Sequence, residues 1–147
     1  MAALLFLLDH YAAGPMGGGQ PLSPETRARL LPGLRQRADY CGFLAWQGDE
    51  AIGLINCFEG FSTFAAAPLM NVHDIVVHEA WRGQGIGQML LDAAEVAART
   101  RSCCKLTLEV LTANQSAMTL YLRAGFEPYV LDPAAGQALL MQKWLGG

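Results

Sequence analysis

The chain has 147 residues, of which 52% are apolar and 16% are charged, and its formal net charge is −3. This composition predicts a globular domain, residues 1–147, with a sizeable core, and it excludes an intrinsically disordered chain. The acidic balance and the scattered basic residues argue against a nucleic-acid partner, because phosphate backbones require a basic face. No apolar run is long enough to cross a bilayer, so we expect no membrane partner.

The four cysteines show neither metal-ligand nor C-x-x-C redox spacing, and they are Cys41, Cys57, Cys103 and Cys104. The adjacent pair Cys103-Cys104 could hardly form a disulfide without strain. We therefore expect reduced, mostly buried thiols in a cytoplasmic protein. We also expect no bound metal.

The first part of the chain predicts a strand, a loop, a helix and a hairpin. The short apolar run at residues 3–8 lacks the basic flank of a signal peptide, and we predict a strand there. Glycines and prolines predict a mobile loop over residues 9–22. Ser23 is a suitable N-cap and Pro24 a suitable first residue for a helix that continues to about residue 38, with a kink or break at Pro32. Residues 43–46 and 51–58 predict two strands, joined by a turn at residues 47–50.

The middle of the chain, residues 71–99, predicts a strand, a glycine-rich turn and a long helix. The strand is rich in β-branched apolar residues, namely Val72, Ile75, Val76 and Val77. Three glycines lie in the turn at residues 82–87, and the helix after them has no further Gly or Pro up to residue 99. Unpaired N–H groups at the positive end of a helix dipole form an anion site, which suits phosphate best.

The last third of the chain predicts three strands and one helix. Residues 105–111 alternate in polarity, with Thr107 and Glu109 on one face of a strand. Asn114 is the expected N-cap of a helix over residues 115–124, and Gly125 is its expected C′ residue. Residues 126–131 and 138–144 predict two final strands. The expected order is β-α-β-β-β-α-β-α-β-β, with an antiparallel meander of strands two to four and parallel strands at 72–77 and 105–111.

The glycine turn does not fit the common nucleotide-binding fingerprints. In the G-x-G-x-x-G pattern, the third glycine would fall on Gln88 or on Leu90, depending on the register. A Walker loop is excluded because the sequence contains no Gly-Lys-Ser/Thr. The spacing that remains is Arg82-x-x-Gly85-x-Gly87, between a strand and a helix.

With this spacing the chain resembles the GNAT superfamily of acyl-CoA-dependent N-acyltransferases. A second block also resembles the family: Leu108-Glu109-Val110, Asn114, Ala117, Tyr121 and Gly125-Phe126. The resemblance implies an α+β fold with a mixed sheet in a single three-layer domain, and acetyl-CoA or another acyl-CoA as the donor. By the resemblance, the backbone of Ile75, Val76 and Val77 pairs with the pantetheine arm. The expected cofactor-binding residues beyond this strand are Arg82, Gly83, Gln84, Gly85, Ile86, Gly87, Gln88 and Asn114, the last of which could instead be only a helix cap.

Acyl transfer to an amine requires a neutral amine, a stabilised carbonyl oxygen and a proton for the departing thiolate. The oxygen would be held by the backbone N–H of Val76 or Val77. Tyr121 matches the usual acid of the family, although it could instead pack in the core. The base is expected at Glu109, with Asp74 as a close rival, unless Asp74 only bonds to a neighbouring loop. Further candidates, in falling order, are Glu59 and the histidines His73 and His78.

These features predict an N-acetyltransferase that moves an acetyl group directly from acetyl-CoA to a primary amine, with a small-molecule acceptor favoured over a protein. The alternative is a non-catalytic acyl-CoA sensor or partner-binding module. In the variable stretch at residues 59–69, Phe61 and Phe64 could line the acceptor pocket together with Phe58, or all three could pack in the core. The apolar residues 138–144 would permit a homodimer.

Overall fold

The structure is a computed structural model that describes residues 2–130 and 132–146. These residues divide into two compact units, one that ends at Leu108 and one that begins at Glu109. The single domain over residues 1–147 stays a prediction, and the two units are described separately. Among the described residues, no helix is both long and apolar enough to span a bilayer.

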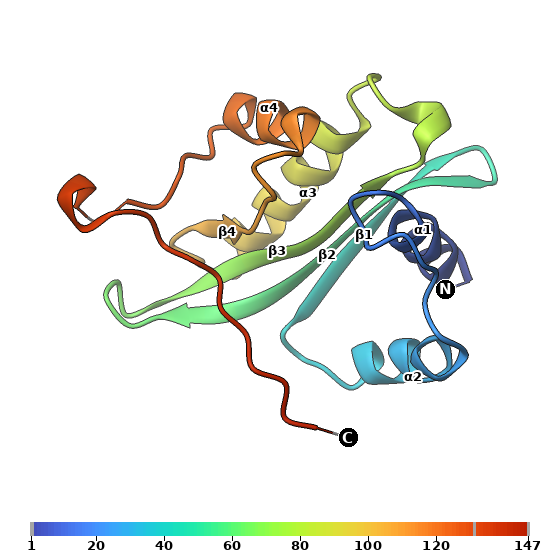
Figure 1. The fold of residues 1–147 in the computed structure, drawn as a ribbon, viewed down its shortest axis with the longest axis horizontal. Coiled ribbons are helices and arrows are strands. Elements are labelled where there is room, and N and C mark those ends of the chain that lie inside the picture. The colour runs from blue at the N-terminus through green and yellow to red at the C-terminus, as the bar shows by residue number, and fades with distance from the viewer. Residues whose placement is uncertain (1, 131, 147) are drawn as a thin grey trace. The chain divides into compact units, whose positions relative to one another are not determined.

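The first unit is built on a four-stranded sheet in the order β1-β2-β3-β4 (Figure 1). The strands are β1 (Tyr40–Gln47), β2 (Glu50–Ser62), β3 (Ala67–Val77) and β4 (Leu106–Leu108). The first three strands form an antiparallel meander, and β4 lies parallel to β3. Both pairings confirm the predicted mixed sheet, including the parallel neighbours on either side of the long helix.

Helices cover both faces of this sheet (Figure 1). They are α1 (Ala2–Ala13), α2 (Pro24–Arg35) and α3 (Ile86–Thr100), with a short 3-10 helix, η1 (Glu79–Trp81), before α3. Leucines of α1 and α2 pack on Leu54 and Val76 on one face. On the other face, a Cβ atom at Gly53 would lie 3.0 Å from Ile86 Cγ2 and 3.1 Å from the Leu90 side chain. The missing side chain at Gly53 therefore lets the start of α3 lie close to the sheet.

The start of the chain is a helix, so the predicted strand at residues 3–8 is wrong. The segment contains Ala, Leu and Phe but no β-branched residue, and such a composition favours a helix. Leu4 and Leu7 are both buried, a spacing that fits one face of a helix. The predicted loop starts only after Ala13, because α1 includes Asp9, which forms an ion pair with Arg27 of α2.

The structure confirms α2 with its N-cap, since Ser23 Oγ accepts a hydrogen bond from the Thr26 N–H at 3.1 Å. The helix is one element that contains Pro32 and ends at Arg35, earlier than predicted. The hairpin turn at residues 47–50 is also confirmed, with Gln47 paired to Glu50. Residues 59–69 are strand on either side of a tight turn, because β2 extends to Ser62 and β3 begins at Ala67.

The second unit contains α4 (Gln115–Arg123) and the short η2 (Pro133–Ala135). Its described residues contain no strand, so the strands predicted at 126–131 and 138–144 are not found there; Leu131 lies outside the described residues. A strand needs a partner for its backbone groups, which composition alone cannot supply. Several apolar side chains of this segment are more than 80% exposed: Leu139, Leu140, Met141 and Trp144. The observed order is α-α-β-β-β-α-β-α, and the strand predicted at residues 105–111 shortens to Leu106–Leu108.

Candidate functional site

The outer edge of β3 is only partly paired. On one side, β2 pairs with β3 from Ala67 to Val77, whereas β4 pairs only with Met70, Asn71 and Val72. In the described sheet, the last residues of β3 therefore have a partner on one edge and none on the other. An unpaired strand edge can bind an extended ligand through backbone hydrogen bonds.

A β-bulge lies where the pairing with β4 stops. Asn56 of β2 faces Asp74, while the next residue, Cys57, faces Val72, so His73 is an extra residue in β3. A bulge bends its strand and increases the local twist. The ring of His73 packs edge-on against Phe58, with centroids 5.5 Å apart. The bulge therefore gives His73 a packing contact with Phe58, and the pairing of β3 with β4 ends beside it at Val72.

Alternation along β3 identifies the groups on the open edge. The His78 N–H donates to the Ile52 carbonyl at 2.8 Å, so residue 78 faces β2. Because neighbouring residues of a strand point their backbone groups to opposite edges, Ile75 and Val77 face the open edge and Val76 faces β2. The Val77 carbonyl accepts a hydrogen bond from Arg82 Nε at 3.2 Å. Of the two N–H groups predicted to hold the carbonyl oxygen, the geometry therefore favours that of Val77.

The glycine turn follows this edge directly. His78 Nδ1 accepts a hydrogen bond from the Ala80 N–H at 3.2 Å and so begins η1. Gly83 and Gly85 have left-handed φ angles of 76° and 83°, and a Cβ at either position would meet nothing within 4 Å. Gly85 is the N-cap of α3 and offers no side chain to its first turn.

The N–H groups of the turn are available to a ligand. Among the described residues, no backbone hydrogen bond outside the helices and strands uses the N–H groups of residues 83–88. The first N–H groups of a helix also have no partner within that helix. The turn therefore combines several donors with open space and the positive end of α3, and these properties suit a phosphate group.

Asp74 is held by a buried amide. The Tyr40 hydroxyl lies 2.7 Å from Asn56 Oδ1, and Asn56 Nδ2 lies 3.1 Å from Asp74 Oδ2. Asn56 is 2% exposed, whereas Asp74 is half-buried. The expectation that Asp74 bonds only to a neighbouring loop is wrong, because the donor of its hydrogen bond, Asn56, belongs to the adjacent strand β2. Burial, with nearby Cys57, Cys41 and Asp74, raises the pKa of Tyr40, so its hydroxyl stays protonated.

The other two carboxylates lie in different surroundings. Glu59 forms an ion pair with Arg101, with 3.1 Å between the Glu59 oxygen and the guanidinium nitrogen. Arg101 also donates to backbone carbonyls of Ala38 and Tyr40, so the pair ties the end of α3 to β1 and β2. Glu109 is exposed and follows β4 directly, as the first residue of the second unit.

The second unit contains Asn114 and Tyr121. Asn114 is the N-cap of α4, as predicted, since its Oδ1 accepts a hydrogen bond from the Ala117 N–H at 3.3 Å. Tyr121 is 8% exposed, and its ring packs edge-on against Phe126 with centroids 6.0 Å apart. Gly125, with φ of 97°, follows the helix as the expected C′ residue. Whether Asn114 and Tyr121 also touch a ligand stays a prediction.

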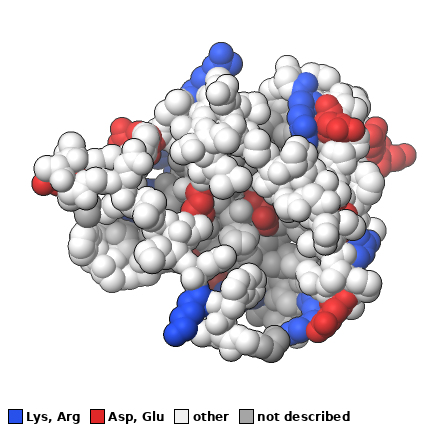
Figure 2. Space-filling model, in the orientation of Figure 1, with Lys and Arg blue, Asp and Glu red and all other residues white. Residues whose placement is uncertain are grey.

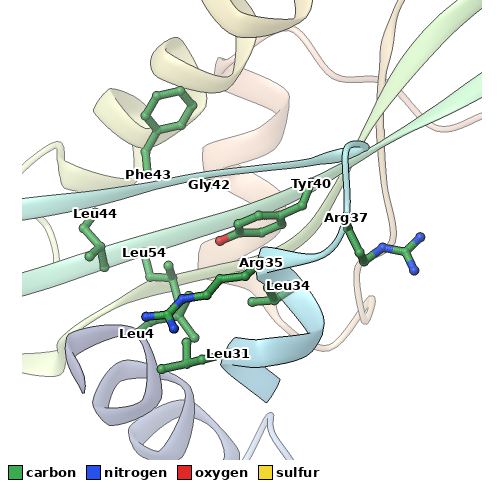
Figure 3. Close-up of a pocket in the computed structure, with 10 residues that line it drawn as sticks. All are labelled: Leu4, Leu31, Leu34, Arg35, Arg37, Tyr40, Gly42, Phe43, Leu44 and Leu54. Carbon is green, nitrogen blue, oxygen red and sulfur yellow. The ribbon is translucent and has the colours of Figure 1, made fainter. Parts of the chain in front are cut away.

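A cavity of about 380 Å³ lies between α1, α2 and the start of β1 (Figure 3). Tyr40 lines it, and its hydroxyl reaches away to Asn56. Arg37, which also lines it, is ion-paired with Asp39 at 2.7 Å. Most of the remaining lining is apolar, so the cavity suits an apolar group; these residues include Leu4, Leu31, Leu34, Leu44 and Leu54.

The aromatic residues of the β2–β3 hairpin divide into two groups. Phe58 packs against the core formed by α1 and α2. Phe61 and Phe64 are 64% and 90% exposed, so core packing is wrong for both. The molecular surface carries acidic and basic side chains interspersed on the face shown in Figure 2. Among the described residues, no group of three or more His, Cys, Asp or Glu side chains could hold a metal ion, and the absence of a metal stays a prediction.

The cysteines are less buried than expected. None forms a disulfide, and only Cys57 is buried; Cys104 is exposed. Burial raises the pKa of Cys57 to about 12, so this thiol stays protonated and unreactive at neutral pH.

Sequence reasoning missed Tyr40, Gly53 and Asn56. Asn56 had a readable signal, because it is a polar residue inside an apolar strand, the same signal that identified Asp74. Gly53 and Tyr40 had none, since their roles depend on neighbours that are far away in the sequence.

Comparisons with known proteins agree with this geometry. The sequence model of the acetyltransferase (GNAT) family matches residues 7–126. Streptothricin acetyltransferase of Streptomyces lavendulae is 40% identical over 68 residues, which cover 46% of this chain and 36% of that protein. N-alpha-acetyltransferase MAK3 of Arabidopsis thaliana is 35% identical over 86 residues, covering 57% of this chain and 43% of that protein.

The matched segments cover between 36% and 46% of the length of the curated relatives. Among solved structures, a transcriptional regulator from Bacillus halodurans superposes with a TM-score of 0.81 and 21% identity, covering 97% of this chain and 94% of that one. At that identity the similarity establishes the fold. Together with the family match over most of the sequence, the open edge of β3 and the glycine turn lead to one conclusion: this chain belongs to the acetyltransferase (GNAT) family.

Proposed function

We propose that the protein is an N-acetyltransferase that moves an acetyl group from acetyl-CoA to a primary amine of a small molecule. The observation that carries this proposal is that two binding surfaces follow one another along the chain, first the open edge of β3 and then the glycine turn. The open edge of β3 presents the N–H groups of Ile75 and Val77, and the donors of the glycine turn follow within a few residues. Acetyl-CoA presents its groups in the same order, because its extended pantetheine arm, which carries amides, ends in a pyrophosphate.

The residues of this stretch fit acetyl-CoA by chemistry and by space. The glycine turn at residues 82–88 would hold the pyrophosphate, because a phosphate oxygen can approach backbone N–H groups where Gly83 and Gly85 have no side chain. The edge of β3 would pair with the amides of the pantetheine arm, as in β-strand addition. Arg82 supports the edge indirectly, since its side chain holds the Val77 carbonyl.

In the proposed reaction the amine nitrogen attacks the thioester carbonyl carbon, the carbon–sulfur bond breaks, and the amine loses one proton. The Val77 N–H would stabilise the carbonyl oxygen as negative charge develops on it. Asp74 or Glu109 would accept the proton from the amine. Tyr121 would donate a proton to the departing thiolate, and Asn114 would contact the donor near its thioester.

The acceptor is proposed from the names of two relatives and from one cavity. Streptothricin acetyltransferase is named for streptothricin and MAK3 for an α-amino position, so the names of these relatives do not agree on one acceptor. The apolar cavity beside Tyr40 favours a small acceptor with an apolar part. The four unbridged cysteines agree with a cytoplasmic location, and a homodimer through residues 138–144 remains part of the proposal.

The decisive experiment measures coenzyme A release from acetyl-CoA in the presence of polyamines, aminoglycosides, amino acids and short peptides. We expect release above the hydrolysis rate with at least one small amine. Binding of acetyl-CoA without turnover across the whole panel would instead favour a non-catalytic sensor or partner-binding module. Failure to bind acetyl-CoA would reject both functions.

A pH–rate profile then separates the three candidate carboxylates. Loss of the true base should abolish the acidic limb of the profile, because that limb reports ionisation of the group that accepts the proton. Asp74→Asn, Glu109→Gln and Glu59→Gln are compared with the unsubstituted protein. An unchanged limb in all three variants would mean that the base is water or that the reaction uses none.

A further inference from the structure

The line of polar groups that ends at Asp74 runs across three strands of the sheet. Tyr40 of β1 donates to Asn56 of β2, and Asn56 donates to Asp74 of β3. Asn56 is almost completely buried. Leu54 and Phe58, two residues before and after it on the same face of β2, pack in the apolar core with α1 and α2. Burial of an amide costs free energy unless its groups are paired, so this position needs a specific reason.

The direction of each hydrogen bond follows from the chemistry of the end groups. An ionised carboxylate only accepts hydrogen bonds, so the Asn56 amide must turn its Nδ2 to Asp74. Its Oδ1 then faces Tyr40, whose hydroxyl must be the donor. The raised pKa of Tyr40 agrees with this, because the phenol keeps its proton. The three side chains therefore form one chain of hydrogen bonds in which each donor points toward Asp74.

Gly42 is part of the same arrangement. A Cβ at Gly42 would lie 2.1 Å from the Tyr40 hydroxyl, so the ring lies across this glycine (Figure 3). No side chain other than hydrogen fits there without displacing the hydroxyl from Asn56. The close approach at Gly42 thus serves the hydrogen bond between Tyr40 and Asn56.

Asp74 differs from the other carboxylates in what holds it. Glu59 is ion-paired with Arg101, whereas the hydrogen bond to Asp74 comes from the uncharged amide of Asn56 and is accepted by Oδ2. The carboxylate is half-buried and precedes Ile75, whose backbone faces the open edge of β3. These are the properties of a group that receives a cationic amine and then its proton.

We propose that Asn56 and Tyr40 are positioning residues that orient Asp74 to bind the acceptor ammonium and to accept its proton, an inference that rests on the proposed acetyl transfer. The bound ammonium first gives one proton to the Asp74 carboxylate, which passes it to solvent, and the neutral amine then attacks. As the nitrogen–carbon bond forms and the carbon–sulfur bond breaks, the nitrogen gives its second proton to Asp74. The departing thiolate takes a proton from Tyr121, and the proton on Asp74 replaces it through solvent, so the net release is one proton. Asn56 holds one carboxylate oxygen in place, and Tyr40 holds the amide.

The test uses the full chain, acetyl-CoA and the panel amine with the highest kcat/KM. We expect Asp74→Asn to lower kcat/KM for the amine about a hundredfold. Asn56→Leu should lower it at least tenfold and Tyr40→Phe about threefold or more, while KM for acetyl-CoA stays within twofold. Gly42→Ala should resemble Tyr40→Phe, because it displaces the same hydroxyl.

Thr107→Val is the matched control. The Asn71 amide donates to Thr107 Oγ1 at 3.0 Å, so this variant also removes a neutral hydrogen bond between two strands. It should lower the melting temperature by an amount similar to Tyr40→Phe but leave kcat/KM for the amine unchanged. Equal losses of activity in Thr107→Val and Tyr40→Phe would overturn the proposal.

A double-mutant cycle distinguishes positioning from a structural role. If Asn56 acts through Asp74, adding Asn56→Leu to Asp74→Asn should cause no further loss of kcat/KM. A persistent tenfold loss in that background would show that Asn56 only stabilises the fold. Should Asn56→Leu fail to fold, the same cycle with Tyr40→Phe gives the answer.

Two outcomes distinguish failure of the proposed function from failure of this inference. If the unsubstituted protein acetylates none of the amines, the proposed function fails and this inference fails with it. If the protein is active but its activity does not change when Asn56 or Tyr40 is replaced, only the inference is rejected.

Discussion

At the scale of single residues, the most informative feature is a pair of polar side chains inside apolar strands. Asp74 stands out in the sequence because a carboxylate among β-branched residues needs a partner. The structure supplies that partner as Asn56, whose own polar groups are satisfied by Tyr40 on one side and Asp74 on the other. The sequence shows Asn56 and Asp74 as polar residues inside apolar strands. It does not show that Tyr40, Asn56 and Asp74 form one row of hydrogen bonds, because the register of β1, β2 and β3 decides which residues lie side by side.

Tyr121 gives the residue-scale prediction for the acid. Tyr121→Phe should lower kcat at least tenfold, because the departing thiolate loses its proton donor, and it should leave acetyl-CoA affinity nearly unchanged. The measurement is steady-state coenzyme A release together with calorimetric binding of acetyl-CoA. Tyr129→Phe, in the same unit but 57% exposed, is the control and should keep full activity. Unchanged kcat in Tyr121→Phe would remove this tyrosine from the mechanism.

At the scale of elements, the stretch from β3 to α3 behaves as the sequence predicts. The β-branched run forms β3, the glycines form a left-handed turn, and α3 begins at Ile86. These are local properties: each residue type has a strong preference for its place. The local pattern does not predict that β4 ends as early as Leu108. Only the pairing of β4 with β3 shows this, because Val72 is the last residue of β3 that pairs with β4.

Gly85→Ala tests the glycine turn. We expect acetyl-CoA affinity to fall about tenfold, because a left-handed alanine is strained by roughly 1–2 kcal/mol and the turn must shift its N–H groups to relieve the strain. Isothermal titration calorimetry measures the change.

Gly48→Ala is the matched control for this turn. Gly48 also has a positive φ, 57°, with nothing within 4 Å of a built Cβ, but it lies in the β1–β2 turn. Both variants should lose similar stability, and only Gly85→Ala should lose affinity. Equal affinities in the two variants would contradict an anion site at residues 83–88.

The helical start of the chain gives a second prediction at this scale. Leu4→Ala and Leu7→Ala should each lower the free energy of unfolding by about 2–5 kcal/mol, because both side chains are buried in one core. Phe6→Ala should cost less than about 1 kcal/mol, since Phe6 is 54% exposed. Denaturant unfolding measures all three. In a strand, residues 4 and 7 would face opposite sides, so a large loss at only one of them would argue against α1.

At the scale of the whole molecule, ligand binding and stability are linked. If the folded chain binds acetyl-CoA and the unfolded chain does not, a ligand concentration of about one hundred times Kd should add about 2.7 kcal/mol to the free energy of unfolding. Chemical denaturation with and without acetyl-CoA measures this. The gain should shrink in Gly85→Ala at the same ligand concentration. No gain in the unsubstituted protein would reject acetyl-CoA as its ligand.

The sequence by itself determined the family, the order of strand, glycine turn and helix at residues 71–99, and most elements between residues 23 and 124. The reason is that these features are local: a cap, a glycine turn with fixed spacing and strong periodicity each involve residues close together in the chain. Only the tertiary structure decided the start of the chain, the end of β4 and the surroundings of the carboxylates. Residues 3–8 are apolar enough for either a strand or a helix, and packing of Leu4 and Leu7 on the sheet selects the helix. The sequence makes Asp74 and Glu59 candidates for the same role, and the tertiary structure separates them. Strand pairing brings the amide of Asn56 to Asp74, whereas the end of α3 brings Arg101 to Glu59.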